Sequence, residues 1–302
     1  MTKLNTKILI PIAFFAIYVI WGSTYLMNKI AVQQLSPFFL ASIRFFLSSL
    51  LILFISKLMK LNLKISKKEL LNTILVGFMF LVFGNGVFVW SLKYIDSGFA
   101  ALLASTQPLF VLLLMRLIDN KKIKSKSLIG IALGIIGMYL LISQKELTTD
   151  DDTLLGMFMI FACVLVWSFA SIYVKKAELP KSYFVSTGYQ MLFASIILFF
   201  ISLSFNEEWI SPIDWNANVI LSMILLIIFG SIVAFTAFNY LLKEVSTEKV
   251  ATSAYVNPVI ALILGWYVLG EQLSTQSIVA SIILLTGVYF ITSKKKTPKE
   301  NL

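Results

Sequence analysis

Residues 8–28 read ILIPIAFFAIYVIWGSTYLMN, a stretch of 21 residues without a single charged side chain. A helix needs about 20 apolar residues to cross the hydrocarbon core of a membrane, so this stretch is long enough to span one. It follows Lys3 and Lys7, as the apolar part of a signal peptide would, but it continues through Trp21 to Met27 without a small-residue cleavage site. We interpret it as a retained first membrane helix.

Nine further stretches of this kind follow along the chain: 36–56, 70–91, 97–115, 127–144, 153–174, 182–206, 215–242, 250–270 and 272–293. Arg44 is the one charged residue within all ten. Transmembrane β-strands are shorter and alternate in polarity, which these runs do not. The sequence therefore predicts an all-α integral membrane protein with ten transmembrane helices.

The amino-acid composition excludes several classes of function. Hydrophobic residues make up 59% of the chain and charged residues only 13%, about half the charged fraction of soluble domains. One cysteine, Cys163, and no histidine exclude disulfides, zinc clusters and histidine-based catalysis within this chain. The sequence also lacks a P-loop, so ATP does not drive this chain. We predict no catalytic residue, no metal and no cofactor, and hence not an enzyme.

The basic residues predict the orientation. With a cytoplasmic N-terminus, 21 of the 25 Lys and Arg residues fall in cytoplasmic segments, and only Lys29, Lys93 and Lys145 fall outside. This asymmetry is the positive-inside pattern and places both termini in the cytoplasm. The net charge of +10 then reflects topology, and nucleic acid is not an expected partner.

The two halves of the chain resemble each other. Trp21 and Lys29, eight residues apart, recur as Trp167 and Lys175 at an offset of 146, and Phe83-Gly84 recurs as Phe229-Gly230. Further on the offset is 150, with Gln107-Pro108 matching Asn257-Pro258 and Gly137 matching Gly287. Residues 8–144 thus form one five-helix repeat and residues 153–293 a second. Since five is odd, the second repeat is inverted, an arrangement that builds transporters; the alternative is a duplication that merely stabilises a bundle.

Several motifs resemble a known family. They are Ile20-Trp21-Gly22-Ser23-Thr24-Tyr25, Arg44-Phe45-Phe46, Ala104-Ser105-Thr106-Gln107-Pro108, Asn257-Pro258, and Gly270-Glu271 with Gly287. In this order the chain resembles the drug/metabolite transporter superfamily, in its ten-helix EamA-type branch. The resemblance implies a central cavity surrounded by the first four helices of each repeat, with the fifth packed outside. It also implies export or exchange of small metabolites, including amino acids, across the inner membrane.

Arg44 is the most informative candidate for substrate binding. Helical rise places Trp21, Arg44 and Asn85 at one level in the outer part of the membrane, with Gln107 somewhat deeper. A charged residue in a span normally faces the bundle interior or water. Arg44 has three interpretations: a clamp for a substrate carboxylate, snorkelling to the interface, or a structural bond to backbone carbonyls. Its repeat mate is the neutral Gln190, so the positive charge lies on the outer half.

Aromatic rings and prolines supply the other candidates. Trp21, Trp90 and Trp167 are predicted to form apolar walls or gates of a pocket, or alternatively an interfacial belt. Pro108 and Pro258 each free a helix carbonyl near mid-membrane, a usual place for transporter sites, unless they only kink the packing. Gln107 stands beside the first proline. Tyr255 and Asn257 stand beside the second.

No Asp or Glu lies within a predicted helix away from its ends, since Asp96, Glu248 and Glu271 are at boundaries. Coupling through a membrane-buried carboxylate is therefore unsupported. We expect an inner-membrane secondary carrier of small polar metabolites, with amino acids or their derivatives as the leading case; the alternative is a multidrug or lipophilic-compound effluxer. Its partners are a small-molecule solute and the lipid bilayer. Gly130-x-x-x-Gly134 predicts close helix packing, within the bundle or in a homodimer.

Overall fold

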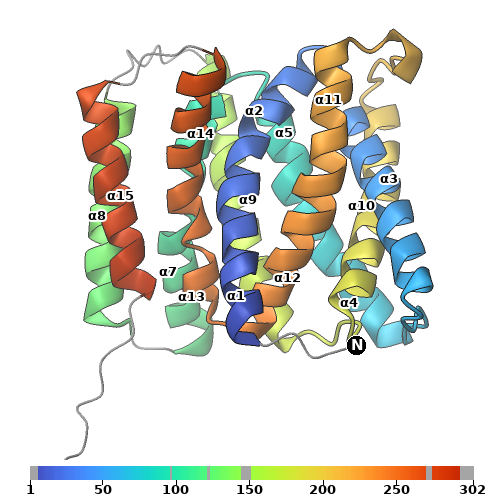
Figure 1. The fold of residues 1–302 in the computed structure, drawn as a ribbon, viewed down its shortest axis with the longest axis horizontal. Helices are drawn as coiled ribbons and strands as arrows, with labels where there is room; N and C mark the ends of the chain where they lie inside the picture. Colours follow the sequence, from blue (N-terminus) through green and yellow to red (C-terminus); the bar gives the residue numbers. More distant parts are fainter. Residues whose placement is uncertain (1–5, 96, 121–122, 144–150, 270–273, 293–302) are drawn as a thin grey trace, which may run out of the picture.

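The computed structural model describes residues 6–95, 97–120, 123–143, 151–269 and 274–292. In this part of the chain ten helical spans run up and down side by side (Figure 1), which confirms the predicted all-α membrane fold. Six of them are long and apolar enough to cross a membrane by length and composition alone. These are Thr6–Val32, Pro37–Leu58, Lys67–Ser91, Asp152–Lys176, Tyr183–Ser204 and Ala217–Glu244.

Three spans contain an internal π-helical segment, in which the turns widen. The first span is α1 (Thr6–Phe15), η1 (Ala16–Ile20) and α2 (Trp21–Val32). The third is α4 (Lys67–Gly77), η2 (Phe78–Val87) and α5 (Phe88–Ser91), and the eighth is α11 (Ala217–Leu225), η4 (Leu226–Ala234) and α12 (Phe235–Glu244). Such segments are frequent at functional sites, because the widened turn redirects side chains and backbone groups.

The fourth and ninth spans are interrupted. The fourth consists of α6 (Ser97–Ala104) and α7 (Gln107–Asp119), and the ninth of α13 (Thr247–Val250) and α14 (Ser253–Leu269). Pro108 lies in the first turn of α7, where a missing N–H costs no helix bond. Pro258 lies inside α14, and the second interruption is at Ala251–Thr252, six residues before it.

The remaining spans are single helices: α3 (Pro37–Leu58), α8 (Ser125–Ile142), α9 (Asp151–Lys176), α10 (Tyr183–Ser204) and α15 (Thr275–Thr292). A short 3-10 turn, η3 (Pro212–Asp214), precedes α11. The helix α3, which carries Arg44, is fixed at its N-terminus by Glu207, whose carboxylate accepts bonds from the Phe38 and Phe39 N–H groups at 3.1 and 2.8 Å. A carboxylate at a helix N-terminus satisfies otherwise unpaired donors and complements the helix dipole.

The spans form two layers closed by two helix pairs. The pair α3 and α10 closes one end of the molecule and the pair α8 and α15 the other (Figure 1). Between them, α1–α2 packs on α11–α12 and on α14, which we call the front layer. The helix α9 packs on α4–α5 with η2 and on α6 and α7, which we call the back layer.

The glycines of α8 pack within the bundle. A Cβ at Gly130 would come within 2.6 Å of the Ile291 side chain of α15, and one at Gly134 would overlap the Tyr255 phenol. Of the two uses predicted for this motif, the structure shows packing inside the chain.

Candidate functional site

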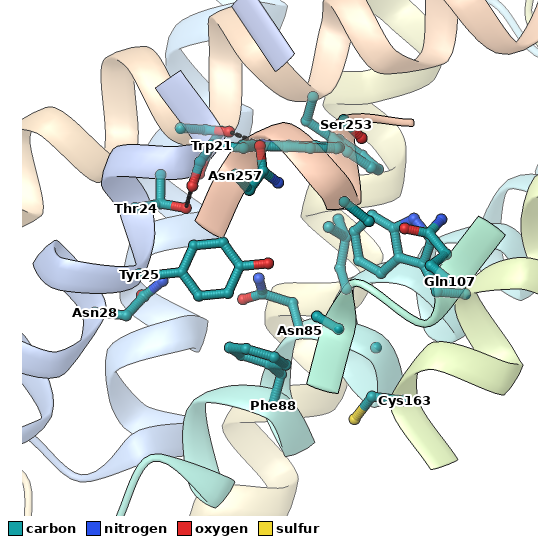
Figure 2. A pocket seen from close by; sticks show the side chains of 18 of the residues that line it. Trp21, Thr24, Tyr25, Asn28, Asn85, Phe88, Gln107, Cys163, Ser253 and Asn257 are labelled. Carbon is teal, nitrogen blue, oxygen red and sulfur yellow. Dashed lines mark hydrogen bonds between the residues drawn. The ribbon is translucent and has the colours of Figure 1, made fainter. Parts of the chain in front are cut away.

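A pocket with a cavity volume of about 110 Å³ lies between the two layers (Figure 2). Its aromatic lining residues are Trp21, Tyr25, Phe45, Phe88, Trp167 and Phe235. Its polar and sulfur-bearing ones are Thr24, Asn28, Arg44, Asn85, Gln107, Cys163, Ser231, Ser253 and Asn257. Among these described lining residues there is no Asp or Glu.

Two tryptophans from opposite layers meet in the wall of the pocket. The ring centroids of Trp21 and Trp167 are 5.8 Å apart with the planes at 81°, an edge-to-face contact. The Trp21 Nε1–H donates to the Gly230 carbonyl at 3.2 Å. On the other side, a Cβ on Gly84 would come within 2.6 Å of the Trp167 indole. Each tryptophan therefore packs on the glycine of the other half of the chain, and both line the pocket rather than an outer belt.

Arg44 is buried, with 3% of its surface exposed. Its Nε–H donates to Ser231 Oγ at 2.8 Å and its Nη1 donates to Asn28 Oδ1 at 3.3 Å. These partners are side chains from the eighth and first spans, so the guanidinium neither reaches the outer interface nor bonds mainly to backbone. No carboxylate is paired with Arg44 in the described part of the chain. A guanidinium has five N–H donors, and these two bonds use two of them.

Asn85 carries an unpaired acceptor at the same pocket. Its Oδ1 is buried and has no hydrogen-bond partner among the described residues. Leaving such a group unpaired costs about 1–3 kcal/mol. The Tyr25 ring points toward Asn85 across the pocket (Figure 2). The site thus offers a cation at Arg44 and a free acceptor at Asn85.

Asn257 joins the first and ninth spans. In the orientation that satisfies its surroundings, its amide nitrogen donates to the carbonyl oxygens of Ser253 at 3.0 Å, Tyr18 at 3.1 Å and Ile17 at 3.2 Å. Ile17 and Tyr18 belong to the π-helical segment η1, where the regular helix bonds are disturbed. Asn257 therefore holds this segment against α14 inside the front layer.

The structure brings together six of the predicted substrate-binding residues: Trp21, Arg44, Asn85, Gln107, Trp167 and Asn257. The others lie outside the pocket. Trp90 packs with Phe38 and Phe205 at ring distances of 5.5 and 5.4 Å. Gln190 is buried and bonded to Ser186 Oγ at 3.0 Å. Tyr255 packs against the glycine face of α8.

The helix-break prolines, Pro108 and Pro258, also lie outside the pocket lining. They contribute instead through the neighbouring residues Gln107 and Asn257, which do line it.

Sequence reasoning missed Thr24, Tyr25, Asn28 and Ser231. The first three follow Trp21 at three, four and seven residues, which is one face of a helix, so the helical period alone could have selected them. Ser231 stands at the offset of 146 from Asn85, and the repeat could have pointed to it. The π-helical segments η2 and η4, which carry Asn85 and Ser231, could not be predicted from a pattern in the sequence.

Comparison with known proteins places the chain in a family. The model of the EamA-like transporter family matches residues 8–143 and again residues 154–293. The uncharacterized inner membrane transporter YedA of Escherichia coli (strain K12) is 34% identical over 284 residues, covering 94% of this chain and 90% of the relative. A probable amino-acid metabolite efflux pump of Salmonella typhimurium is 26% identical over 282 residues, covering 90% and 91%.

A solved crystal structure shares the fold, with a TM-score of 0.77, 16% identity, and coverage of 93% of this chain and 95% of that one. The two family matches, each about half of the chain, agree with a duplicated repeat. These matches confirm the family predicted from the sequence motifs. The chain belongs to the EamA-like transporter family, and it is a multi-pass transporter of the inner membrane rather than an enzyme.

Proposed function

We propose that the chain is a secondary carrier of small polar metabolites that bear a carboxylate, with export or facilitated diffusion of amino acids or their derivatives as the leading case. The solute binds in the pocket between the front and back layers, and the carrier works by alternating access. The repeats 8–144 and 153–293 are inverted relative to each other, and both termini face the cytoplasm.

The matching of elements supports the inverted repeats. The helices α3 and α10 are both 22 residues long and lie 146 residues apart, while α8 and α15 are both 18 residues long and lie 150 apart. Each of these repeat-related pairs packs together at one end of the molecule. The reciprocal Trp21–Gly230 and Trp167–Gly84 contacts relate the pocket walls in the same way.

The buried guanidinium of Arg44 beside the pocket is the single observation on which the proposed substrate class, solutes with a carboxylate, rests. Its hydrogen-bond partners are the neutral side chains of Ser231 and Asn28, so its charge is uncompensated in the described structure. Burying an unpaired charge is costly, and a bound carboxylate would form a charge-assisted pair with it. The Asn85 Oδ1 acceptor suits an ammonium or hydroxyl donor of the same solute.

The name of the Salmonella relative, a probable amino-acid metabolite efflux pump, is consistent with this proposal. The runner-up is a multidrug effluxer of the same fold, which the aromatic walls of the pocket favour. Arg44 argues against it for cationic drugs, because like charges repel at a desolvated site.

An uptake screen in proteoliposomes tests the proposal. Amino acids and other small carboxylates should be taken up faster than by empty liposomes, and the corresponding amines without a carboxylate should not. Preferential uptake of lipophilic cations would favour the runner-up. Absence of flux for every solute class would contradict a carrier.

A further inference from the structure

Lys29 and Lys175 lie at opposite ends of the helical spans and make equivalent hydrogen bonds. Lys29, at the end of α2, donates from Nζ to the carbonyls of Leu92 at 2.7 Å and Ile95 at 3.2 Å, just after α5. Lys175, at the end of α9, donates from Nζ to the carbonyl of Val245 at 2.6 Å, just after α12. Lys29 and Lys175 are repeat mates at an offset of 146, and Ile95 and Val245 at 150. Both donor and acceptor therefore recur.

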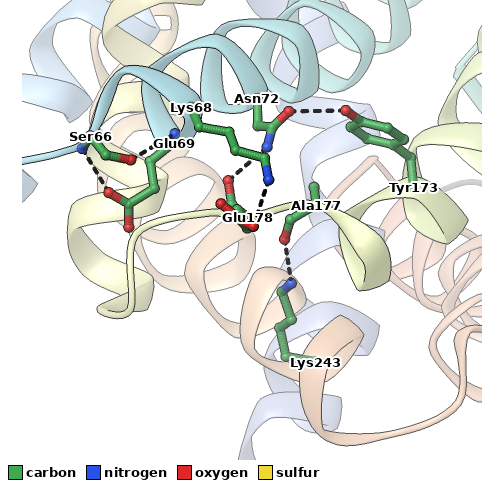
Figure 3. Close-up of polar contacts among 8 residues, drawn as sticks. All are labelled: Ser66, Lys68, Glu69, Asn72, Tyr173, Ala177, Glu178 and Lys243. Carbon is green, nitrogen blue, oxygen red and sulfur yellow. Dashed lines mark hydrogen bonds and ion pairs between the residues drawn. The ribbon is translucent and has the colours of Figure 1, made fainter.

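Each of these bonds crosses from one layer to the other. Lys29 belongs to the front layer and its acceptors follow α5 of the back layer. Lys175 belongs to the back layer and its acceptor follows α12 of the front layer. Lys243 of α12 adds a reciprocal link at the end of α9, because its Nζ donates to the Val174 carbonyl at 2.5 Å. It also donates to the Ala177 carbonyl at 3.2 Å (Figure 3).

Further polar contacts join neighbouring spans of one layer. Asn72 of α4 accepts from the Tyr173 hydroxyl at 3.0 Å and donates to the Glu178 carbonyl at 2.9 Å (Figure 3). Both α4 and α9 belong to the back layer. In the front layer, the Tyr18 hydroxyl bonds to Thr252 Oγ1 at 2.8 Å. Such bonds hold each layer together as a unit.

The pocket lies midway between the two sets of lysine bonds. Lys29 is eight residues beyond Trp21 and Lys175 is eight residues beyond Trp167, and both tryptophans line the pocket. At 1.5 Å per helical residue this is about 12 Å in each case. The two spans run in opposite directions in the inverted arrangement, so one lysine lies on each side of the pocket.

The chemistry of these bonds suits a gate. The last carbonyls of a helix have no partner within the helix, and an ammonium there also complements the helix dipole. Lys29 is half-buried and Lys175 and Lys243 are exposed, so water can solvate both partners when a bond opens. A buried ion pair would instead leave two costly charges behind.

We propose that Lys29 is the latch of the outer gate and that Lys175, with Lys243, is the latch of the cytoplasmic gate of the same pocket. The inference rests on the alternating-access function proposed above. Breaking one latch favours the state in which the pocket opens on that side. The cytoplasmic gate has two lysines, Lys175 and Lys243. The repeat mate of Lys243 at the offset of 150 is Lys93, which is exposed and is not assigned to the outer gate.

Cys163, the one cysteine of the chain, is a built-in reporter because it lines the pocket and is buried. We would measure its modification by a membrane-impermeant maleimide in right-side-out and inverted membrane vesicles. Lys29→Gln should raise the labelling rate from the outer side about tenfold, and Lys175→Gln with Lys243→Gln should do so from the cytoplasmic side. Lys29→Arg and Lys175→Arg, which keep a cationic donor, should label nearly as slowly as the wild type. Lys93→Gln and Lys181→Gln are exposed-lysine controls.

The proposal would be overturned if Cys163 in the Gln variants were labelled at the wild-type rate. It would also be overturned if the Lys29 variant and the Lys175–Lys243 variant both accelerated labelling from the same side of the membrane. The labelling experiment needs no solute, so it can be carried out even if no transported solute is found. A failed uptake screen would therefore count against the proposed carrier function and not against the two gates. Melting temperatures identify a variant that is merely unstable. For that case, paired cysteines test the same contacts: Lys29→Cys with Ile95→Cys, or Lys175→Cys with Val245→Cys, each in a Cys163→Ser background. Exchange by Cys163→Ser alone is the reference. A short cleavable bis-maleimide should abolish exchange relative to that reference, and cleavage should restore it. Unimpaired exchange after complete cross-linking would equally contradict the gates.

Discussion

At the scale of single residues, Arg44 is the group whose position most needs an explanation. A charged side chain at the centre of a membrane helix costs about 2.5–3.5 kcal/mol on insertion scales. Here it is held by Ser231 and Asn28, which come from two other spans and carry no charge. Packing alone does not require a guanidinium at this place. In the function proposed above, an anionic group of the solute supplies the missing partner.

Replacing Arg44 tests this directly. Arg44→Ala should weaken binding of a carboxylate solute about 10- to 150-fold, because it removes a charge-assisted pair. Arg44→Lys should rescue binding only in part, because an ammonium lacks the planar two-pronged donor. The measurement is solute affinity together with the melting temperature, and the exposed Arg116→Ala is the matched control. Unchanged affinity in Arg44→Ala would remove Arg44 from the site.

Asn257 gives a second residue-scale prediction. Its amide nitrogen donates to three carbonyls, so Asn257→Asp would face them with an acceptor and should lower stability by at least about 1–3 kcal/mol. Thermal unfolding in detergent measures this. In the control Asn216→Asp, the Oδ1 that caps α11 by accepting from Val219 N–H at 2.9 Å is kept, so stability should hold. Equal stability of the two variants would show that the Asn257 amide is not the donor.

At the scale of elements, the ten spans and the duplication could be predicted from the sequence, because apolar runs and repeated motifs report them directly. The broken helices were harder to place. Pro108 marks the interruption of the fourth span, but the ninth span breaks at Ala251–Thr252 while Pro258 sits within α14. A proline removes one helix bond, and the surrounding spans decide where the chain actually leaves the helix.

The glycine face of α8 yields an element-scale prediction. A Cβ at Gly134 would overlap the phenol of Tyr255 on α14, so Gly134→Ala should force α8 away from α14 and lower stability by about 1–3 kcal/mol. Solute affinity should change little, since neither residue lines the pocket. Ala132→Leu, on the exposed side of α8, should be tolerated. A melting temperature unchanged by Gly134→Ala would contradict the close packing.

At the scale of the whole molecule, the sequence predicted which residues lie at one depth but not which way they face. Trp21, Arg44 and Asn85 do meet in the pocket, as their depths suggested. Trp90, Gln190 and Tyr255 do not, because helix phase turned them toward neighbouring helices. Phase depends on packing between distant spans, and the widened turns of η2 and η4 shift it further.

The orientation can be tested with reporter fusions. Fusions after Lys64, Lys124 and Lys299 should report the cytoplasm, since the positive-inside pattern places these lysines there. Fusions at Asp151 and Asn206 should report the outside. A cytoplasmic signal at Asp151 would mean that both halves enter the membrane from the same side, which is incompatible with inverted repeats.

Counterflow in proteoliposomes tests the central claim most directly, namely that the pocket between the two layers is alternately open to either side. Vesicles loaded with an unlabelled carboxylate solute should take up the labelled solute faster than empty-lumen vesicles, without ATP and without a proton gradient. The acceleration follows because a solute on the far side returns the occupied carrier, and it should be lost in Arg44→Ala. Uptake that is indifferent to the internal solute, or that requires an imposed pH gradient, would contradict this account.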